Sequence, residues 1–191
     1  AVVIEGPEAT AFIEATRAAL AASAPQTMLT DGIAAAYAAG TARMAESAGV
    51  RTVLGAESPT RAAAPALFEV SGQDWLAYHA LGEEVFGPLG LVVRVADAGE
   101  MAAIARALEG QLTCTLQMDE GDTAQARALL PVLERKAGRV LANGFPTGVE
   151  VCDAMVHGGP YPASTNFGAT SVGTLSIRRF LRPVCYQNLP E

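Results

Sequence analysis

The sequence predicts an α/β fold in which a parallel sheet lies between two layers of helices. Apolar runs at residues 89–95, 111–118 and 139–142 have the length of strands, and they are apolar at nearly every position. Such runs are typical of strands that are buried on both faces. Residues 98–108 and 123–137 lie between the runs and have the length and composition of helices, with Asp97 expected to cap the first and Gly138 expected to end the second. This alternation indicates a three-layer αβα domain.

The first half of the chain adds elements of the same kind. Residues 1–4 read as the middle of a strand, so we expect the chain to begin inside an element of a larger fold. Residues 7–23 follow as a helix that starts with Pro7, whose missing N–H costs nothing in a first turn. Residues 30–48 form a second, Ala-rich helix.

Shorter elements precede the regular half. Residues 51–54 and 66–70 are strand candidates, and residues 73–80 are a candidate helical turn. Tyr37 and Met44 are seven residues apart, which places both on one face of the second helix.

Composition excludes several classes of function. The net charge of −7 over 191 residues argues against a surface for nucleic acid. No apolar run reaches the roughly 18 residues of a membrane span, and no signal peptide opens the chain, so we expect a cytoplasmic protein. The three cysteines, Cys114, Cys152 and Cys185, are widely spaced, which supports neither a disulfide framework nor a metal site.

The stretch Glu83-Glu84-Val85-Phe86-Gly87-Pro88 combines two acids, an aromatic ring and a stiff Gly-Pro turn. A ribose diol needs a carboxylate that accepts two hydroxyl hydrogen bonds, and a flat heterocycle packs well beside an aromatic face. The alternative is a solvated acidic turn before a strand, since most charged loop residues are simply hydrated.

A long segment without periodicity occupies residues 143–167. Segments of this length in a compact domain are usually functional or disordered, and its many apolar residues favour a functional loop at the carboxyl ends of the strands. Residues 171–180 then suggest a short helix. Residues 182–189 suggest a terminal strand that pairs with another sheet edge.

The Glu83–Pro88 stretch resembles the Glu-Glu-x-Phe-Gly-Pro motif of the aldehyde dehydrogenase superfamily. Further resemblances follow in the family's order at residues 138–143, 157–163, 170–173 and 180–188. They are most similar to the branch that contains α-ketoglutaric semialdehyde (2,5-dioxovalerate) dehydrogenases and NADP-dependent fatty aldehyde dehydrogenases. The resemblance covers essentially the whole chain but only the C-terminal part of the family's length.

The resemblance implies an enzyme that oxidises an aldehyde to an acid with NAD or NADP, through a thiohemiacetal on a cysteine. Glu84 matches the residue that holds the nicotinamide ribose, and Phe86 matches the residue beside the nicotinamide ring. The nucleophilic cysteine and the general base would lie before Ala1, so we expect this fragment to be inactive alone.

Cys114 is a poor candidate for the nucleophile. It follows a Gly-Gln pair, as the family's nucleophile does, but it stands one residue too far from Gln111. A thiol in a buried strand also has a raised pKa and low reactivity.

The resemblance places five loop residues near the aldehyde channel, although each could instead pack the loop: Asn143, Phe145, Val151, His157 and Tyr161. It also implies a division of the chain into a catalytic-domain fragment, residues 1–176, and an oligomerisation strand, residues 177–191.

The partners implied are a small-molecule aldehyde, the N-terminal remainder of the enzyme and further copies of the chain, with no nucleic acid, membrane or metal. A rival interpretation is a non-catalytic α/β binding or assembly module derived from the same fold.

Overall fold

The computed structural model describes residues 1–55, 60–149, 152–166, 168, 170–188 and 190. They belong to two compact units, Ala1–Ile104 and Ala105–Glu191, and each unit is described by itself. The boundary expected at residue 176 and the assignment of residues 177–191 to oligomerisation stay predictions. In the described ranges, no helix has the length and apolar character needed to cross a bilayer.

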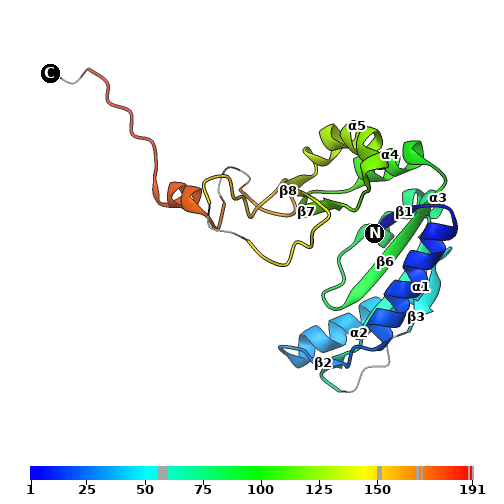
Figure 1. The fold of residues 1–191 in the computed structure, drawn as a ribbon. Coiled ribbons are helices and arrows are strands. Elements are labelled where there is room, and N and C mark those ends of the chain that lie inside the picture. The colour runs from blue at the N-terminus through cyan, green and yellow to red at the C-terminus, as the bar shows by residue number, and fades with distance from the viewer. Residues whose placement is uncertain (56–59, 150–151, 167, 169, 189, 191) are drawn as a thin grey trace. The chain divides into compact units, whose positions relative to one another are not determined.

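Helices and strands alternate along most of the chain (Figure 1). The α-helices are α1 (Pro7–Ala21), α2 (Asp31–Glu46), α3 (Gly72–Ala77), α4 (Ala98–Ala107) and α5 (Thr123–Leu133). The 3₁₀ turns are η1 (His79–Gly82), η2 (Glu120–Asp122) and η3 (Thr174–Phe180). The strands are β1 (Val2–Ile4), β2 (Gln26–Thr27), β3 (Arg51–Leu54), β4 (Ala62–Ala63), β5 (Ala66–Ser71), β6 (Leu89–Val95), β7 (Gln111–Leu116) and β8 (Ala137–Ala142).

Local signals fix where the helices begin. The Thr30 hydroxyl accepts a hydrogen bond from the Ile33 N–H at 3.2 Å and so caps α2. The carboxylate of Asp97 accepts from the Glu100 N–H at 2.9 Å, which confirms the cap expected at the start of α4. These side chains satisfy N–H groups that have no partner inside the first turn of a helix.

The first unit is built on a four-stranded sheet of order β1-β6-β5-β3. β6 runs parallel to both β1 and β5, whereas β3 runs antiparallel to β5. The expected parallel sheet is therefore confirmed for β1, β6 and β5, and β3 adds an antiparallel edge strand. Parallel neighbours need a crossover element, and the described part of the link from β3 to β5, residues 55 and 60–65, carries only the two-residue β4.

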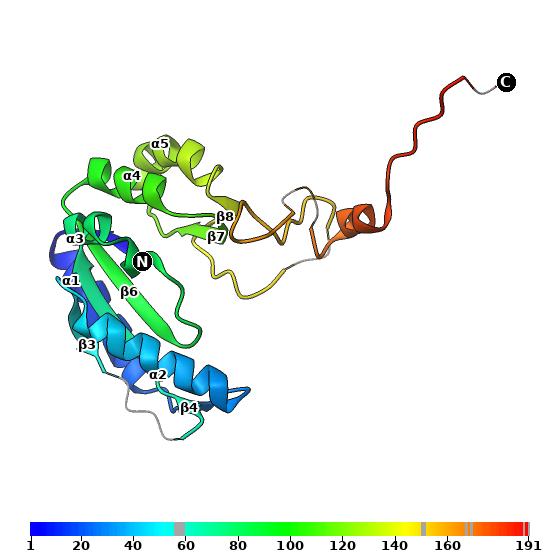
Figure 2. The ribbon, with the colours of Figure 1, turned by 180° about the vertical axis from the view of Figure 1, so that it is seen from behind.

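Helices cover both faces of this sheet. Successive side chains of each strand point to opposite faces, so the apolar strands present apolar side chains on both. On one face Leu67 and Val92 pack with Ile13 of α1. On the other, Phe68 and neighbouring strand residues pack with Met44 of α2 and with residues from α3 and α4. Views from opposite sides show α1 and α2 on different sides of the sheet (Figure 1, Figure 2), which confirms the three layers.

The second unit contains a separate parallel pair of strands, β7 and β8. α5 ends at Leu133, earlier than expected, because Ala137 already pairs with Gln111 and the intervening Lys136 carbonyl accepts from the Gln111 N–H at 2.6 Å. The described part of residues 143–166 contains neither helix nor strand.

Residues 174–188 contain one short helix followed by an extended segment. The helix expected at residues 171–180 is the 3₁₀ turn η3. Residues 182–188 pair with no strand among the described residues, and Leu189 lies outside them. Apolar side chains along this arm face solvent, with Phe180 86% and Tyr186 75% exposed. The backbone of an extended segment needs hydrogen-bond partners, which a second copy of the chain could supply. Pairing between copies stays a prediction.

Candidate functional site

The most distinctive exposed segment is residues 84–88, which we call the Glu84 segment. It connects η1 to β6 and therefore lies at the amino end of that strand. The Glu84 side chain is exposed and Phe86 is 69% exposed, although an aromatic ring is normally buried. Val85, between them, is half-buried. Val85 thus faces the protein between two residues that face solvent.

Helix α2 holds the two inward positions. Val85 packs against Gly40, where an added Cβ would lie only 2.6 Å from the Val85 Cγ1. Gly87 adopts a φ of 144°, and a Cβ there would lie 2.3 Å from Cδ2 of the Tyr37 ring. Both glycines are required by close approach, and Gly87 also by its backbone conformation.

Tyr37 adds hydrogen bonds to this packing. Its hydroxyl lies 2.6 Å from the Ala64 carbonyl and 3.4 Å from the Pro88 carbonyl. The Pro88 carbonyl also accepts from the Ala66 N–H at 2.9 Å. Tyr37 is only 1% exposed, and burial raises the pKa of its phenol, which therefore stays protonated as a donor.

The arrangement gives an outward carboxylate and an outward aromatic ring on a fixed backbone. Glu84 can accept a pair of hydroxyl hydrogen bonds, and the face of Phe86 can lie beside a flat ring. In the described part of the chain no three His, Cys, Asp or Glu side chains come together as a metal site. The chemistry of the Glu84 segment suits a nucleoside with a planar base.

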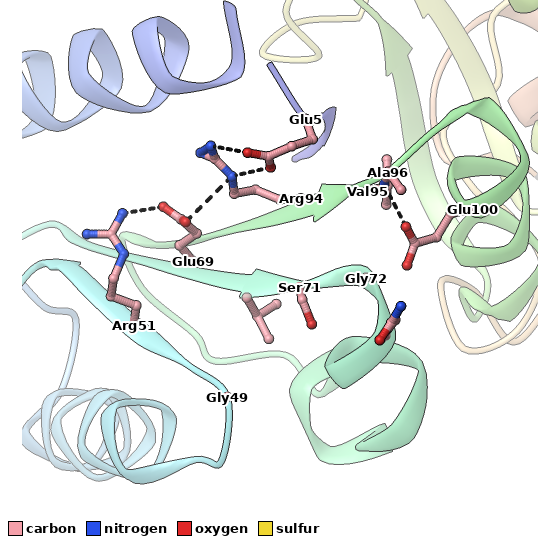
Figure 3. Close-up of a pocket in the computed structure, with 12 residues that line it drawn as sticks. Glu5, Gly49, Arg51, Glu69, Ser71, Gly72, Arg94, Val95, Ala96 and Glu100 are labelled. Atoms are coloured by element: carbon pink, nitrogen blue, oxygen red, sulfur yellow. Dashed lines mark hydrogen bonds and ion pairs between the residues drawn. The ribbon is translucent and has the colours of Figure 1, made fainter. Parts of the chain in front are cut away.

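A pocket of about 430 Å³ lies at the carboxyl ends of β5 and β6, opposite the strand ends that the Glu84 segment precedes (Figure 3). Ligands of parallel sheets usually bind at such carboxyl ends. Arg94 donates two hydrogen bonds to Glu5, at 2.6 and 2.9 Å, and its Nε lies 3.7 Å from Glu69. Glu69 also pairs with Arg51. These charged side chains pair with one another across the pocket.

Asn143 follows β8 at the carboxyl ends of β7 and β8, where its amide is engaged. The side chain accepts from the Met118 N–H and donates to the Met118 carbonyl, each at 2.8 Å. Its φ of 49° lies in the left-handed region that Asn tolerates better than most residues. Asn143 therefore joins the ends of the two strands, a structural role that the sequence did not indicate.

Residues 158–160, which lie between His157 and Tyr161 in the sequence, pack against the backbone at the amino ends of β7 and β8. An added Cβ at Gly138 would lie 1.9 Å from the Gly158 carbonyl oxygen, and one at Gly110 would lie 2.0 Å from that of Pro160. Backbone here lies directly on backbone, which only glycine permits.

The expected channel residues that the structure describes are therefore not all gathered in one place. Strands of six residues span roughly 20 Å, and Asn143 and the residues around Gly158 lie at opposite ends of such strands. Phe145 is 81% and Tyr161 79% exposed, and Val151 lies outside the described residues. Their assignment to a substrate channel stays a prediction.

The cysteines differ in environment. Cys114 is half-buried in β7, and burial raises the pKa of its thiol, which lowers the fraction of reactive thiolate. Cys152 and Cys185 are exposed.

No family model matches the chain, but curated relatives do, among them two dehydrogenases. The chain is 55% identical over 190 residues to α-ketoglutaric semialdehyde dehydrogenase 2 of Azospirillum brasilense, which covers 98% of this chain and 36% of the relative. It is 47% identical over 185 residues to α-ketoglutaric semialdehyde dehydrogenase of Acinetobacter baylyi, covering 95% and 34%. The chain thus spans about a third of the length of these relatives.

A solved structure shares the fold. The NAD-dependent benzaldehyde dehydrogenase of Corynebacterium glutamicum matches with a TM-score of 0.60 and 19% identity, over 75% of this chain and 32% of that one.

Proposed function

The chain is an aldehyde dehydrogenase sequence that spans about a third of its curated relatives, and on that premise we propose that the Glu84 segment forms the nicotinamide end of a dinucleotide site. Glu84 accepts hydrogen bonds from the ribose hydroxyls, and Phe86 lies beside the nicotinamide ring. When bound, the nicotinamide of NAD or NADP supplies the hydride acceptor for aldehyde oxidation.

The observation that carries this proposal is the alternation of the segment. Val85 and Gly87 are fixed against α2, and this leaves Glu84 and Phe86 on the solvent side of a backbone that cannot collapse inward. A carboxylate and a ring that are held apart before any ligand arrives need little reordering on binding.

The register of β1 also supports a reaction centre near this segment. Val2 pairs with Val93 in a parallel register, and the Ala1 nitrogen donates to the Leu91 carbonyl at 2.7 Å. Chain that entered β1 in the same register would run beside Leu89 and then past Gly87. In the complete enzyme the nucleophilic thiol approaches Phe86 along that path.

None of the three cysteines serves as that thiol in this proposal. Cys114 lies in the middle of β7 with a raised pKa, and Cys185 lies on the extended arm. The complete enzyme supplies the thiol and the general base from other residues, so these 191 residues alone do not oxidise aldehydes. Measurable turnover by the chain alone would refute this.

The substrate class follows the relatives. The two relatives described above are both named for α-ketoglutaric semialdehyde, and we propose a short aldehyde that carries a carboxylate at its other end. Copies of the complete enzyme associate with one another by pairing residues 182–188.

The test uses a chimera in which this chain replaces the matching segment of the Azospirillum relative. Glu84→Gln keeps the side-chain shape but weakens hydrogen bonds to the ribose, so we expect the KM for the dinucleotide to rise about tenfold or more. Glu83→Gln, an equally exposed neighbour, is the matched control and should leave KM within about twofold.

Two results would count against the proposal. Equal KM values for the Glu84→Gln and Glu83→Gln chimeras would exclude a ribose contact by Glu84. A folded chimera without activity would favour the rival interpretation, a binding or assembly module that kept the fold without the chemistry.

A further inference from the structure

We infer that Tyr37 and Gly40 of α2 are positioning residues that set where Glu84 and Phe86 stand. The inference rests on the proposed function of the Glu84 segment and extends it to a helix about 45 positions earlier in the sequence. Neither α2 residue would touch the dinucleotide.

The two residues form one surface of the helix. Positions three apart on a helix are neighbours on the same face, and both Tyr37 and Gly40 are buried. Gly40 leaves a depression that receives the Val85 side chain, and the Tyr37 ring lies directly against Gly87. Two successive inward positions of the segment thus rest on two successive sites of α2.

The Tyr37 hydroxyl ties this surface to the sheet. It contacts carbonyls of Ala64 and Pro88, which stand just before β5 and β6 respectively. These strands are parallel neighbours, and their first residues pair as Ala66 with Leu89. The phenol therefore links the residues that precede β5 and β6, and so fixes the amino end of β6, which the Glu84 segment precedes.

Displacement of the inward residues must move the outward ones. Val85 stands between Glu84 and Phe86, so a shift of its backbone changes the positions of the carboxylate and the ring together. A nicotinamide riboside that contacts both Glu84 and Phe86 would bind less tightly when the spacing of these two side chains changes, although neither residue is substituted.

The experiment pairs Gly40→Ala with Gly32→Ala in the same helix, using the chimera and the 191-residue chain. A Cβ at Gly40 would collide with Val85, whereas the nearest atom at Gly32 is 3.9 Å away. We expect Gly40→Ala to raise the KM for the dinucleotide about tenfold with kcat changed less, and Gly32→Ala to leave both within about twofold.

A readout without cofactor accompanies the kinetics. Amide hydrogen exchange of residues 84–88 in the full chain should quicken in Gly40→Ala and stay unchanged in Gly32→Ala. Tyr37→Phe keeps the ring against Gly87 but removes the hydroxyl contacts, so we expect a smaller rise in KM, about threefold.

Rescue separates positioning from a general loss of stability. Val85→Ala removes the two methyl groups that a Cβ at Gly40 would meet at 2.6 and 3.1 Å, so the double variant should recover most of the KM lost by Gly40→Ala. The inference is overturned if Gly40→Ala lowers stability while the dinucleotide KM matches that of Gly32→Ala, or if the double variant shows no recovery.

The Glu84→Gln chimera distinguishes the two levels of the argument. If Glu84→Gln raises KM and Gly40→Ala does not, only the positioning role of α2 fails. If Glu84→Gln leaves KM unchanged, the proposed function itself fails.

Discussion

Gly138→Ala tests the backbone packing that holds the loop around His157. The added Cβ would lie 1.9 Å from the Gly158 carbonyl oxygen, 2.7 Å from its carbon and 3.1 Å from the Gly159 Cα. Carbon and oxygen atoms of this kind normally stay about 3.3 Å or more apart, so one backbone must move by more than about 1 Å. All three neighbours are main-chain atoms and cannot rotate away.

The cost follows from this geometry. Overpacking of a closely packed site costs about 1–3 kcal/mol, while replacing Gly with Ala returns about 0.4–1 kcal/mol by restricting the unfolded chain. Neighbouring contacts at Gly159 and Gly110 hold the same loop and prevent an easy shift. We expect a net loss of about 1–2 kcal/mol in the free energy of unfolding.

Urea unfolding followed by far-ultraviolet circular dichroism measures this loss as a lower midpoint. Gly148→Ala is the matched control, because no atom lies within 4 Å of a Cβ there. Hydrogen exchange of residues 157–161 should quicken in Gly138→Ala alone. Equal midpoints for the two variants would refute the packing described here.

Three further predictions concern charge, thiols and pH. Arg94→Met should lower the unfolding free energy by about 1–3 kcal/mol, because the largely buried Arg94 side chain joins Glu5 to Glu69, and the largely buried Glu69 would lose one of its two cations. Arg17→Met removes an exposed pair and should cost under about 0.5 kcal/mol, and urea midpoints that match would contradict this. Iodoacetamide should modify Cys152 well before Cys114, as mass spectrometry of native protein can show, and equal rates would mean that Cys114 is neither buried nor raised in pKa. Because burial raises the pKa of Tyr37 above 10.0, the unfolded chain loses the phenol proton first, so stability present below pH 10 falls as the pH rises further, and Tyr37→Phe should flatten that part of the urea-midpoint profile.

Local sequence patterns predicted the layers of the fold well. The strand candidate at 66–70 and the apolar run at 89–95 became β5 and β6 at the centre of the four-stranded sheet, and the runs at 111–118 and 139–142 became the pair β7 and β8. Tyr37 and Met44 are both buried on the face of α2 that their spacing indicated. Pro7 and Asp97 mark helix starts as expected. These signals act within a few residues, so they can be read without knowing the partners.

Long-range features were not predictable in the same way. The antiparallel direction of β3 depends on how the chain returns to β5, and no residue within Arg51–Leu54 specifies that return. The amide of Asn143 looked like a channel group, yet it joins two backbone groups of Met118, 25 positions earlier. Gly138 looked like a helix stop, although its role is set by contact with Gly158.

For the candidate site, the sequence identified the outward residues and missed their support. Glu84 and Phe86 were selected by chemical type and by resemblance, and both face solvent. That Gly40 and Tyr37 shape the segment needed the packing of α2 in three dimensions. The choice between NAD and NADP, the individual aldehyde, the oligomer and the cytoplasmic location stay predictions.

The contact between Gly87 and Tyr37 has a consequence for how substitutions in this protein should be judged. Gly87 is classed as an exposed residue, and surface positions usually accept most side chains. Here the space that a side chain would fill is already taken by a phenol ring. Exposure therefore does not predict tolerance to substitution within residues 83–88. We expect Glu83 to accept other side chains and Gly87 to accept none.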